Sequence, residues 1–290
     1  MKMKKLTKKI ASAGMVLALA ASLAPTAAFA ATVTESEPNN DRATADVISV
    51  GDTVKGACTY VDGSTADYYK FVAPQSGTIR VGLFNVEANH SITFGLRDAS
   101  GNILQHTGTS TQDSFEYSIS AGQTYYVYTT PVWQTDPTYE LQIEYVNPVY
   151  RLYNAATSEH LWTTSYDEYK ALPTYGWKQE GVAWNCPTSS SMGVYRLYNP
   201  GLGTHHYTAS KSEADYLVAN QGWQYDNDGK PLFYSAGETG DNYAGSFNVY
   251  RLYNSDLSQH HYTLDVNEYN TCIDKYNWKG EGVDFYAYEE

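Results

Sequence analysis

The sequence predicts a mainly β protein in two parts: an N-terminal β-sandwich or jelly roll, then a pseudo-threefold, β-rich repeat domain with one short helix per repeat. Short alternating apolar runs between turn residues predict the sandwich. A motif that occurs three times after residue 148 predicts the repeat domain. The composition changes at the same place, because 19 of the 28 Tyr and five of the six Trp residues follow residue 148.

Residues 1–30 are typical of a secretory signal peptide. Five lysines lie among the first nine residues, an apolar stretch follows from about Ile10 to Leu23, and Ala28-Phe29-Ala30 gives the small-x-small cleavage pattern. No later stretch is long and apolar enough for a membrane span. We therefore expect a secreted, extracellular protein that associates with a cell wall only through its own binding domains.

The charge balance limits the classes of partner that the protein is expected to bind. The chain has 19 basic and 32 acidic residues, a formal net charge of -13. Nucleic-acid binders need a basic face, so nucleic acid is not expected as a partner. The balance suits an extracellular monomer that binds cations or neutral ligands.

The three cysteines are too few for a disulfide-dense scaffold. Cys58 is expected to be a buried or free thiol. A bond between Cys186 and Cys272 is compatible with secretion, but the sequence leaves it open.

Residues 31–146 are expected to form the sandwich. Alternating runs occur at residues 78–84, 91–96, 125–128 and 139–143, with turn residues between them. Roughly eight strands in this length fit a sandwich or jelly roll.

Residues 35–145 resemble the bacterial pre-peptidase C-terminal domain, a β-sandwich family that includes the collagen-binding domains of clostridial collagenases. The resemblance rests on the opening residues 35–41, Asp67-Tyr68-Tyr69-Lys70-Phe71, residues 122–127 and the closing residues 139–141. It implies an accessory, non-catalytic module of the kind attached to secreted enzymes.

The opening segment is rich in the oxygen ligands that calcium prefers. Alternation along an extended segment places Glu35, Glu37 and Asn39 on one side. In the resembled collagen-binding domains, this segment and the loop before the Asp-Tyr-Tyr strand hold calcium together. The resemblance therefore implies a Ca²⁺ site made from Glu35, Glu37, Asn39, Asn40, Asp62 and Asp67. The alternative is a solvated acidic linker.

The C-terminal part, residues 149–290, contains three repeats of about 149–193, 194–248 and 249–290. Each begins with Val-Tyr-Arg-Leu-Tyr-Asn, and a His follows nine residues after the Arg. The His opens an aromatic-Thr run, and a capping residue with a Glu three positions later predicts a helix start. Each repeat is therefore expected to fold as strand, turn, strand, short helix, strand.

The helices are expected to end at Gly176, Gly222 and Asn277, residue types that tolerate a left-handed C-terminal conformation. A Trp follows each end. Three units cannot bury their apolar faces singly, so we expect a closed assembly. We expect equivalent buried positions, one in each repeat, for Trp177, Trp223 and Trp278.

Residues 149–286 resemble a bacterial repeat family known only as a domain of unknown function and found on secreted cell-wall hydrolases and lipases. The resemblance rests on Tyr-Arg-Leu-Tyr-Asn, the His-aromatic-Thr run and Gly-Trp. This chain departs from the pattern at Leu161, which follows the first His, and at Asn277, which replaces the Gly. The resemblance implies binding rather than catalysis.

Most of the repeated aromatic residues are expected to pack inside the repeats. Two sets are expected to be exposed and to bind ligand: Tyr153, Tyr198 and Tyr253 in the first strands, and Trp162, Tyr207 and Tyr262 in the His runs. The histidines lack zinc-site spacing and are expected to orient their own repeats through hydrogen bonds. The insertion at residues 226–230 is expected to be an Asp-Gly turn.

These observations favour a secreted, non-catalytic binding protein that attaches to cell-wall or host polysaccharide. One alternative is an adhesin for a collagen-like protein, acting through the sandwich. Another is a cell-wall hydrolase with an unrecognised site, although the sequence lacks a Gly-x-Ser-x-Gly turn and a metalloprotease motif. The sequence thus favours a protein that is not an enzyme without deciding the question.

Overall fold

The computed structural model describes residues 31–59, 66–133, 136–237 and 245–289. The predicted signal peptide and the predicted calcium ligand Asp62 lie outside these residues. Within them the expectation of a mainly β chain with three short helices is confirmed.

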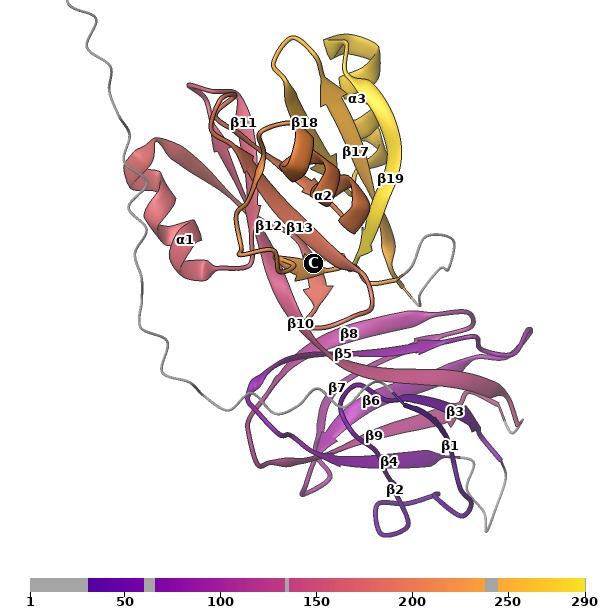
Figure 1. Ribbon diagram of the computed structural model, residues 1–290. Coiled ribbons are helices and arrows are strands. Elements are labelled where there is room, and N and C mark those ends of the chain that lie inside the picture. Colours follow the sequence, from indigo (N-terminus) through magenta and orange to yellow (C-terminus); the bar gives the residue numbers. More distant parts are fainter. Residues whose placement is uncertain (1–30, 60–65, 134–135, 238–244, 290) are drawn as a thin grey trace, which may run out of the picture.

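The N-terminal sandwich consists of two facing sheets (Figure 1). Their strand orders are β1-β3-β10-β5-β8 and β2-β4-β9-β6-β7. The strands are β1 (Thr32–Thr34), β2 (Asp46–Val47), β3 (Thr53–Ala57), β4 (Asp67–Val72), β5 (Gly77–Phe84), β6 (Ile92–Asp98), β7 (Ile103–Thr109), β8 (Asp113–Ile119), β9 (Thr124–Pro131) and β10 (Thr138–Asn154).

Alternation along the strands builds the sandwich core. In β4, Asp67, Tyr69 and Phe71 are buried while Val72 is exposed. Because side chains of an extended strand point alternately to opposite faces, one face of β4 packs inward and the other faces solvent. Asp67 is thereby carried into the interior with the two aromatic rings.

The repeat ring, residues 149–289, contains three copies of one arrangement (Figure 1). In each copy a first strand pairs with a second strand and with the strand or strands after the helix. Repeat one contains the end of β10, β11 (Glu159–Thr163), α1 (Tyr166–Ala171), a 3-10 helix (Leu172–Tyr175) and β12 (Trp177–Pro187). Repeat two contains β13 (Gly193–Asn199), β14 (Thr204–Thr208), α2 (Lys211–Asn220), β15 (Gln224–Tyr225) and β16 (Phe233–Tyr234). Repeat three contains β17 (Phe247–Asn254), β18 (Gln259–Thr263), α3 (Val266–Tyr276) and β19 (Lys279–Ala287).

The helix boundaries follow the capping residues. The side chains of Ser165 and Ser210 accept hydrogen bonds from the backbone N–H groups of Glu168 and Glu213. At the start of α3, the side chain of Asp265 accepts from the N–H group of Asn267. These bonds satisfy donors that a helix start otherwise leaves unpaired. At the other end, Gly176, Gly222 and Asn277 all have positive φ angles, as expected for left-handed helix ends.

Three aromatic rings meet at the centre of the repeat ring. Trp162, Tyr207 and Tyr262 are each 1% exposed, and their centroids lie 5.3–5.5 Å apart in edge-to-face contacts. The Tyr207 hydroxyl donates to the Trp162 carbonyl, and the Tyr262 hydroxyl donates to the Tyr207 carbonyl. The expectation that these three residues are exposed is wrong. In β11, β14 and β18 three consecutive residues are buried, so simple alternation fails there.

The expectation that Trp177, Trp223 and Trp278 are core residues is also wrong, since all three are only half-buried. They follow the helix ends and lie at the surface of the repeat ring. Trp184 is the second core Trp, and it stacks on Trp162 with centroids 6.1 Å apart.

The three cysteines are free thiols, and Cys58 and Cys186 are buried. The insertion in repeat two is a turn in which Asp228 and Gly229 both have positive φ angles. Two adjacent residues of this kind are typical of an Asp-Gly turn, as expected.

Candidate functional site

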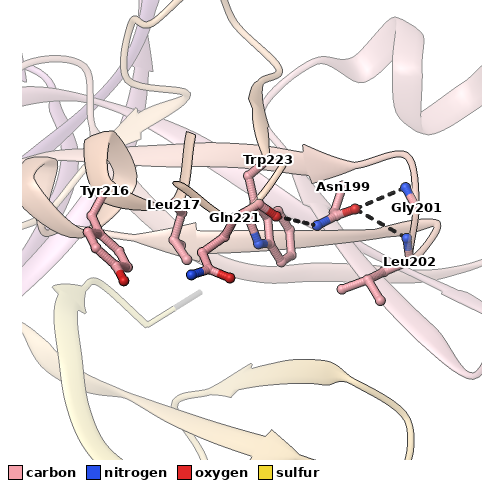
Figure 2. Close-up of a pocket in the computed structure, with 7 residues that line it drawn as sticks. All are labelled: Asn199, Gly201, Leu202, Tyr216, Leu217, Gln221 and Trp223. Carbon is pink, nitrogen blue, oxygen red and sulfur yellow. Dashed lines mark hydrogen bonds between the residues drawn. The ribbon is translucent and has the colours of Figure 1, made fainter. Parts of the chain in front are cut away.

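An open pocket lies on repeat two, beside the C-terminal end of α2. Its volume is about 630 Å³. Figure 2 shows helix residues at one end, turn residues at the other and Trp223 between them. The lining residues are Asn199, Gly201, Leu202, Tyr216, Leu217, Gln221 and Trp223.

Asn199 joins the turn to the end of the helix. Its Oδ1 accepts hydrogen bonds from the N–H groups of Gly201 and Leu202, at 2.9 and 3.2 Å. Its Nδ2 donates to the Gln221 carbonyl at 3.3 Å. This buried side chain therefore fixes the two walls of the pocket relative to each other.

The pocket combines apolar surface with neutral polar groups. Trp223 is half-buried and Gln221 is exposed, while Leu202 and Tyr216 are 55% and 58% exposed. None of the seven lining residues is charged. Largely apolar concave sites with a few polar groups are typical of small-ligand sites, and this lining suits a neutral ligand with both apolar faces and hydroxyl groups.

The other repeats have related surfaces. The half-buried Trp177 and Trp278 take the place of Trp223 after the helix ends. The turn residues Asn154 and Asn254 each accept a backbone hydrogen bond at 3.0 Å, as Asn199 does. Exposed tyrosines precede the helix ends in these two repeats: Tyr175 is 73% exposed and Tyr276 is 63% exposed.

Behind two of these tryptophans lies a buried histidine. The His206 ring is 5.7 Å from the Trp223 ring, and the His261 ring is 6.0 Å from the Trp278 ring. Leu161 occupies the corresponding position in repeat one. A histidine therefore lies behind the pocket of repeat two and behind the related surface of repeat three.

A cycle of ion pairs links the three repeats. The Arg of each first strand contacts the helix Glu of a different repeat. The Arg of repeat one contacts the Glu of repeat three, the Arg of repeat two contacts the Glu of repeat one, and the Arg of repeat three contacts the Glu of repeat two. The pairs are Arg151–Glu268 at 3.5 Å, Arg196–Glu168 at 3.0 Å and Arg251–Glu213 at 3.0 Å. The cycle closes, which gives the ring its three interfaces.

Each of these arginines also contacts an acid of its own repeat through Nε. The partners are Glu180 at 3.0 Å, Asp226 at 2.6 Å and Glu281 at 3.0 Å. These acids stand three residues after the Trp of each repeat, a spacing visible in the sequence that our sequence analysis missed.

The helix carboxylates are held in their charged form. Burial raises the pKa of Glu268, but the hydrogen bond and charge of His261 and the charge of Arg151 outweigh it, and the pKa falls to about 2. The pKa of Glu213 is lowered in a similar way. Burial raises it, but the hydrogen bonds from His206 and Thr208 and the charge of Arg251 outweigh burial. Through the ion pairs with the arginines, these carboxylates join neighbouring repeats of the ring.

The other predicted ligand residues are only partly accessible. Tyr153, Tyr198 and Tyr253 are half-buried, and each packs against the first His of its own repeat with centroids 4.7–4.9 Å apart. His160 and His260 each contact an acid of their own repeat, at 3.5 Å, whereas His205 bonds to Glu159 of the neighbouring repeat.

The predicted calcium ligands partly converge inside the sandwich. The Tyr69 hydroxyl donates to Glu35, and the Tyr139 hydroxyl donates to Asp67 at 2.6 Å, while the two hydroxyls lie 2.6 Å apart. Asn39 donates from Nδ2 to Glu35 at 3.4 Å. The remaining predicted ligands differ in exposure, with Glu37 exposed and Asn40 half-buried.

Several features of this acidic cluster fit a cation. Oδ1 of Asn39 and Oδ1 of Asp67 are buried and accept no hydrogen bond. Burial raises the pKa of Glu35, and burial together with the charge of Glu35 raises the pKa of Asp67 to about 7. Among the described residues, however, no group of three His, Cys, Asp or Glu side chains has the arrangement of a metal site.

Comparisons with known proteins address the repeat ring most directly. Residues 148–288 match the family model described as a domain of unknown function (DUF5648). This range agrees with the resemblance found in the sequence, and the family's description assigns no activity. No curated protein matches the chain.

Solved structures give weaker likenesses. The pre-peptidase C-terminal domain of collagenase from Bacillus anthracis has 24% identity and a TM-score of 0.30, covering 34% of this chain and 94% of that domain. A periplasmic inhibitor of g-type lysozyme from Aeromonas hydrophila has 14% identity and a TM-score of 0.24, covering 40% of this chain and all of that one. In the described part of the chain, every helix is too short or too polar to cross a membrane.

Proposed function

We propose that this chain is a secreted, non-catalytic binding protein that attaches to cell-wall or host polysaccharide through the surface pockets of its repeats. The observation that supports this function is the uncharged pocket on repeat two, with Trp223 between the exposed side chains of Leu202 and Tyr216. Sugar rings present apolar C–H faces and hydroxyl groups, which match such a surface. The related surfaces at Trp177 and Trp278 supply two further contacts.

Three weak sites can hold a repetitive polymer firmly. After one site binds, the others meet the same chain at high effective concentration, so avidity exceeds the affinity of a single pocket. A repetitive polysaccharide is therefore a better ligand for this arrangement than a single sugar.

The test measures retention of the mature protein on purified cell-wall polysaccharide and on collagen. Tyr216→Ala should weaken polysaccharide retention roughly 5- to 30-fold, because loss of a single well-packed aromatic contact costs about 1–2 kcal/mol. Tyr166→Ala is the matched control, since Tyr166 is 55% exposed but lies at the start of α1, outside the pocket. Retention that is equal in both variants would refute the pocket, and retention on collagen alone would favour a protein adhesin.

We further propose that the acidic cluster of the sandwich binds Ca²⁺ through Glu35, Glu37, Asn39, Asn40 and Asp67. The unpaired oxygens of Asn39 and Asp67 and the two buried carboxylates support this role. Bound calcium would tie the N-terminal segment to the sandwich and add stability through mass action.

Calorimetry with calcium, and melting with calcium or chelator, test the site. The melting temperature of the wild type should rise with calcium, and Asp67→Asn should abolish the rise. Glu140→Gln is the control, because Glu140 lies on β10 and pairs only weakly with Lys55, at 3.8 Å. An unchanged wild-type melting curve and no heat of binding would exclude calcium.

A further inference from the structure

The three interfaces of the repeat ring are chemically unequal. Between repeats two and three, Nδ1 of His206 lies 3.2 Å from Nδ1 of His260. Between repeats three and one, the rings of His261 and His160 lie 4.6 Å apart. Between repeats one and two, Leu161 replaces the second histidine, and Glu159 bonds to Nδ1 of His205 at 2.8 Å.

Acid has opposite effects on these two kinds of contact. Two imidazolium rings a few ångströms apart repel each other, whereas an imidazolium beside a carboxylate is attracted to it. Of the three interfaces, only the two histidine–histidine interfaces are subject to this repulsion, and there His261 also faces Glu268 at 3.2 Å and His260 faces Glu281 at 3.5 Å.

His206 is enclosed by groups from several elements. It is 1% exposed, and its Nε2 lies 3.6 Å from the carboxylate of Glu213. The titratable, charged and aromatic groups that face it are Glu213 from α2, Arg251 from β17, His260 and Tyr262 from β18, and Trp223.

His160 has a comparable environment in the other histidine interface. Its Nε2 lies 3.5 Å from Glu180. The groups that face it are Arg151 and Tyr153 from β10, Trp162 from β11, Glu180 from β12, His261 from β18 and Glu268 from α3.

We propose that the two histidine–histidine contacts make the repeat ring a pH-responsive joint, which loosens on acidification at the interfaces of repeat three. Repeat three takes part in both contacts and is the last segment of the ring. Trp223 and Trp278 lie against His206 and His261, so the fluorescence of these tryptophans reports the change.

The direction follows from proton linkage. Burial lowers the pKa of His206 to about 4, and burial with the charges of His261 and Arg151 lowers that of His160 to about 3. An unfolded His binds its proton near pH 6.5, so between pH 6.5 and 4 the unfolded chain holds more protons than the folded chain. Stability therefore falls as the pH falls through this window.

The ring also contains one opposing group. Asp284 faces Arg251 at 3.4 Å, and burial raises the pKa of Asp284 to about 7. Its contribution to stability grows as the pH falls, so the histidine effect must be measured as a difference between variants.

The experiment replaces His206 and His261 together by Leu, the residue that repeat one carries at position 161. Thermal unfolding of the full chain is followed by Trp fluorescence from pH 7 to pH 4. The melting temperature of the wild type should fall as the pH is lowered across this range, and that of the double variant should fall markedly less. The pH at which half of this fall has occurred should be lower in the double variant by about one unit. His106→Gln, at an exposed site on β7 of the sandwich, should behave as the wild type.

A second double variant guards against simple misfolding. His206→Gln with His261→Gln keeps polar side chains but leaves a single histidine in each of the two interfaces, and it should show the same flattened pH dependence. If the stability of either folded double variant falls with pH as steeply as that of the wild type, the histidine–histidine contacts do not make the repeat ring pH-responsive.

Discussion

At the scale of single residues, Asn199 has the most influence on the pocket. It is 8% exposed, and its amide group makes three hydrogen bonds that join the turn to the end of α2. The residues that would touch a ligand, Tyr216 and Leu202, lie on the two segments that Asn199 connects. Pocket shape and ligand contact are thus assigned to different side chains.

Asn199→Ala should therefore lower both stability and ligand retention. Removing the side chain breaks its hydrogen bonds to the backbone of Gly201, Leu202 and Gln221, a loss of about 1–3 kcal/mol in the free energy of unfolding. Denaturant unfolding measures the loss. Asn220→Ala is the control, because Asn220 bonds only to a carbonyl of its own helix. Equal stability of the two variants would show that Asn199 does not hold the pocket.

Asp284 gives a second prediction at this scale. Burial raises the pKa of Asp284 to about 7, so the folded chain holds a proton there between pH 7 and 4 that the unfolded chain releases. This group stabilises the repeat ring progressively as the pH falls. Asp284→Asn removes the titration and should make the acid loss of melting temperature steeper than in the wild type. An unchanged or shallower slope would contradict the raised pKa.

At the scale of elements, the local signals in the sequence predicted the helices well. A capping residue and a Glu three positions later define the starts of α1, α2 and α3, and a Gly or Asn follows the ends of α2 and α3, because these signals act within one or two turns of chain. In repeat one, α1 ends at Ala171 and Gly176 ends the 3-10 helix that follows it. The alternating run at residues 78–84 likewise predicted a strand, and β5 covers Gly77–Phe84. Local backbone chemistry was sufficient for these elements.

The burial of individual aromatic residues could not be predicted in this way. β10 and β17 each contain register shifts at corresponding positions, Val149/Tyr150 and Val249/Tyr250, which interrupt simple alternation. Trp162 is buried because the other two repeats cover it, and that cover depends on contacts distant in sequence.

Ser210→Ala tests the capping of α2. The Ser210 side chain accepts a hydrogen bond from the N–H group of Glu213 at 3.2 Å, and a lost N-cap typically costs about 1 kcal/mol. The cost should be somewhat larger here, because Glu213 also holds Arg251 of repeat three. Denaturant unfolding gives the value, and Ser189→Ala, at an exposed position outside the helices and strands, is the control. A loss no greater than that of the control would mean that the cap contributes nothing.

At the scale of the whole molecule, the sandwich and the repeat ring share a strand. β10 pairs with β3 and β5 in the sandwich and with β11 and β12 in repeat one, passing through the predicted boundary near Asn147 without a break (Figure 1). The end of the chain returns to this junction. The Tyr288 ring lies 4.1 Å from the Arg80 guanidinium, and its hydroxyl donates to Glu144 at 2.5 Å.

These contacts predict that the two parts unfold together. Tyr288 is 2% exposed and touches the sandwich through both its ring and its hydroxyl, so Tyr288→Ala should cost about 3–5 kcal/mol, as for other large buried aromatic residues. It should also split a single thermal transition into two, because the coupling would then depend on β10 and on weaker contacts such as the Asn185–Glu116 hydrogen bond at 2.9 Å. Calorimetry measures both effects. Tyr276→Ala, at a 63% exposed position of α3, should leave one transition and change stability little. Two transitions already present in the wild type would show that the parts are coupled too weakly for the Tyr288 contacts to matter.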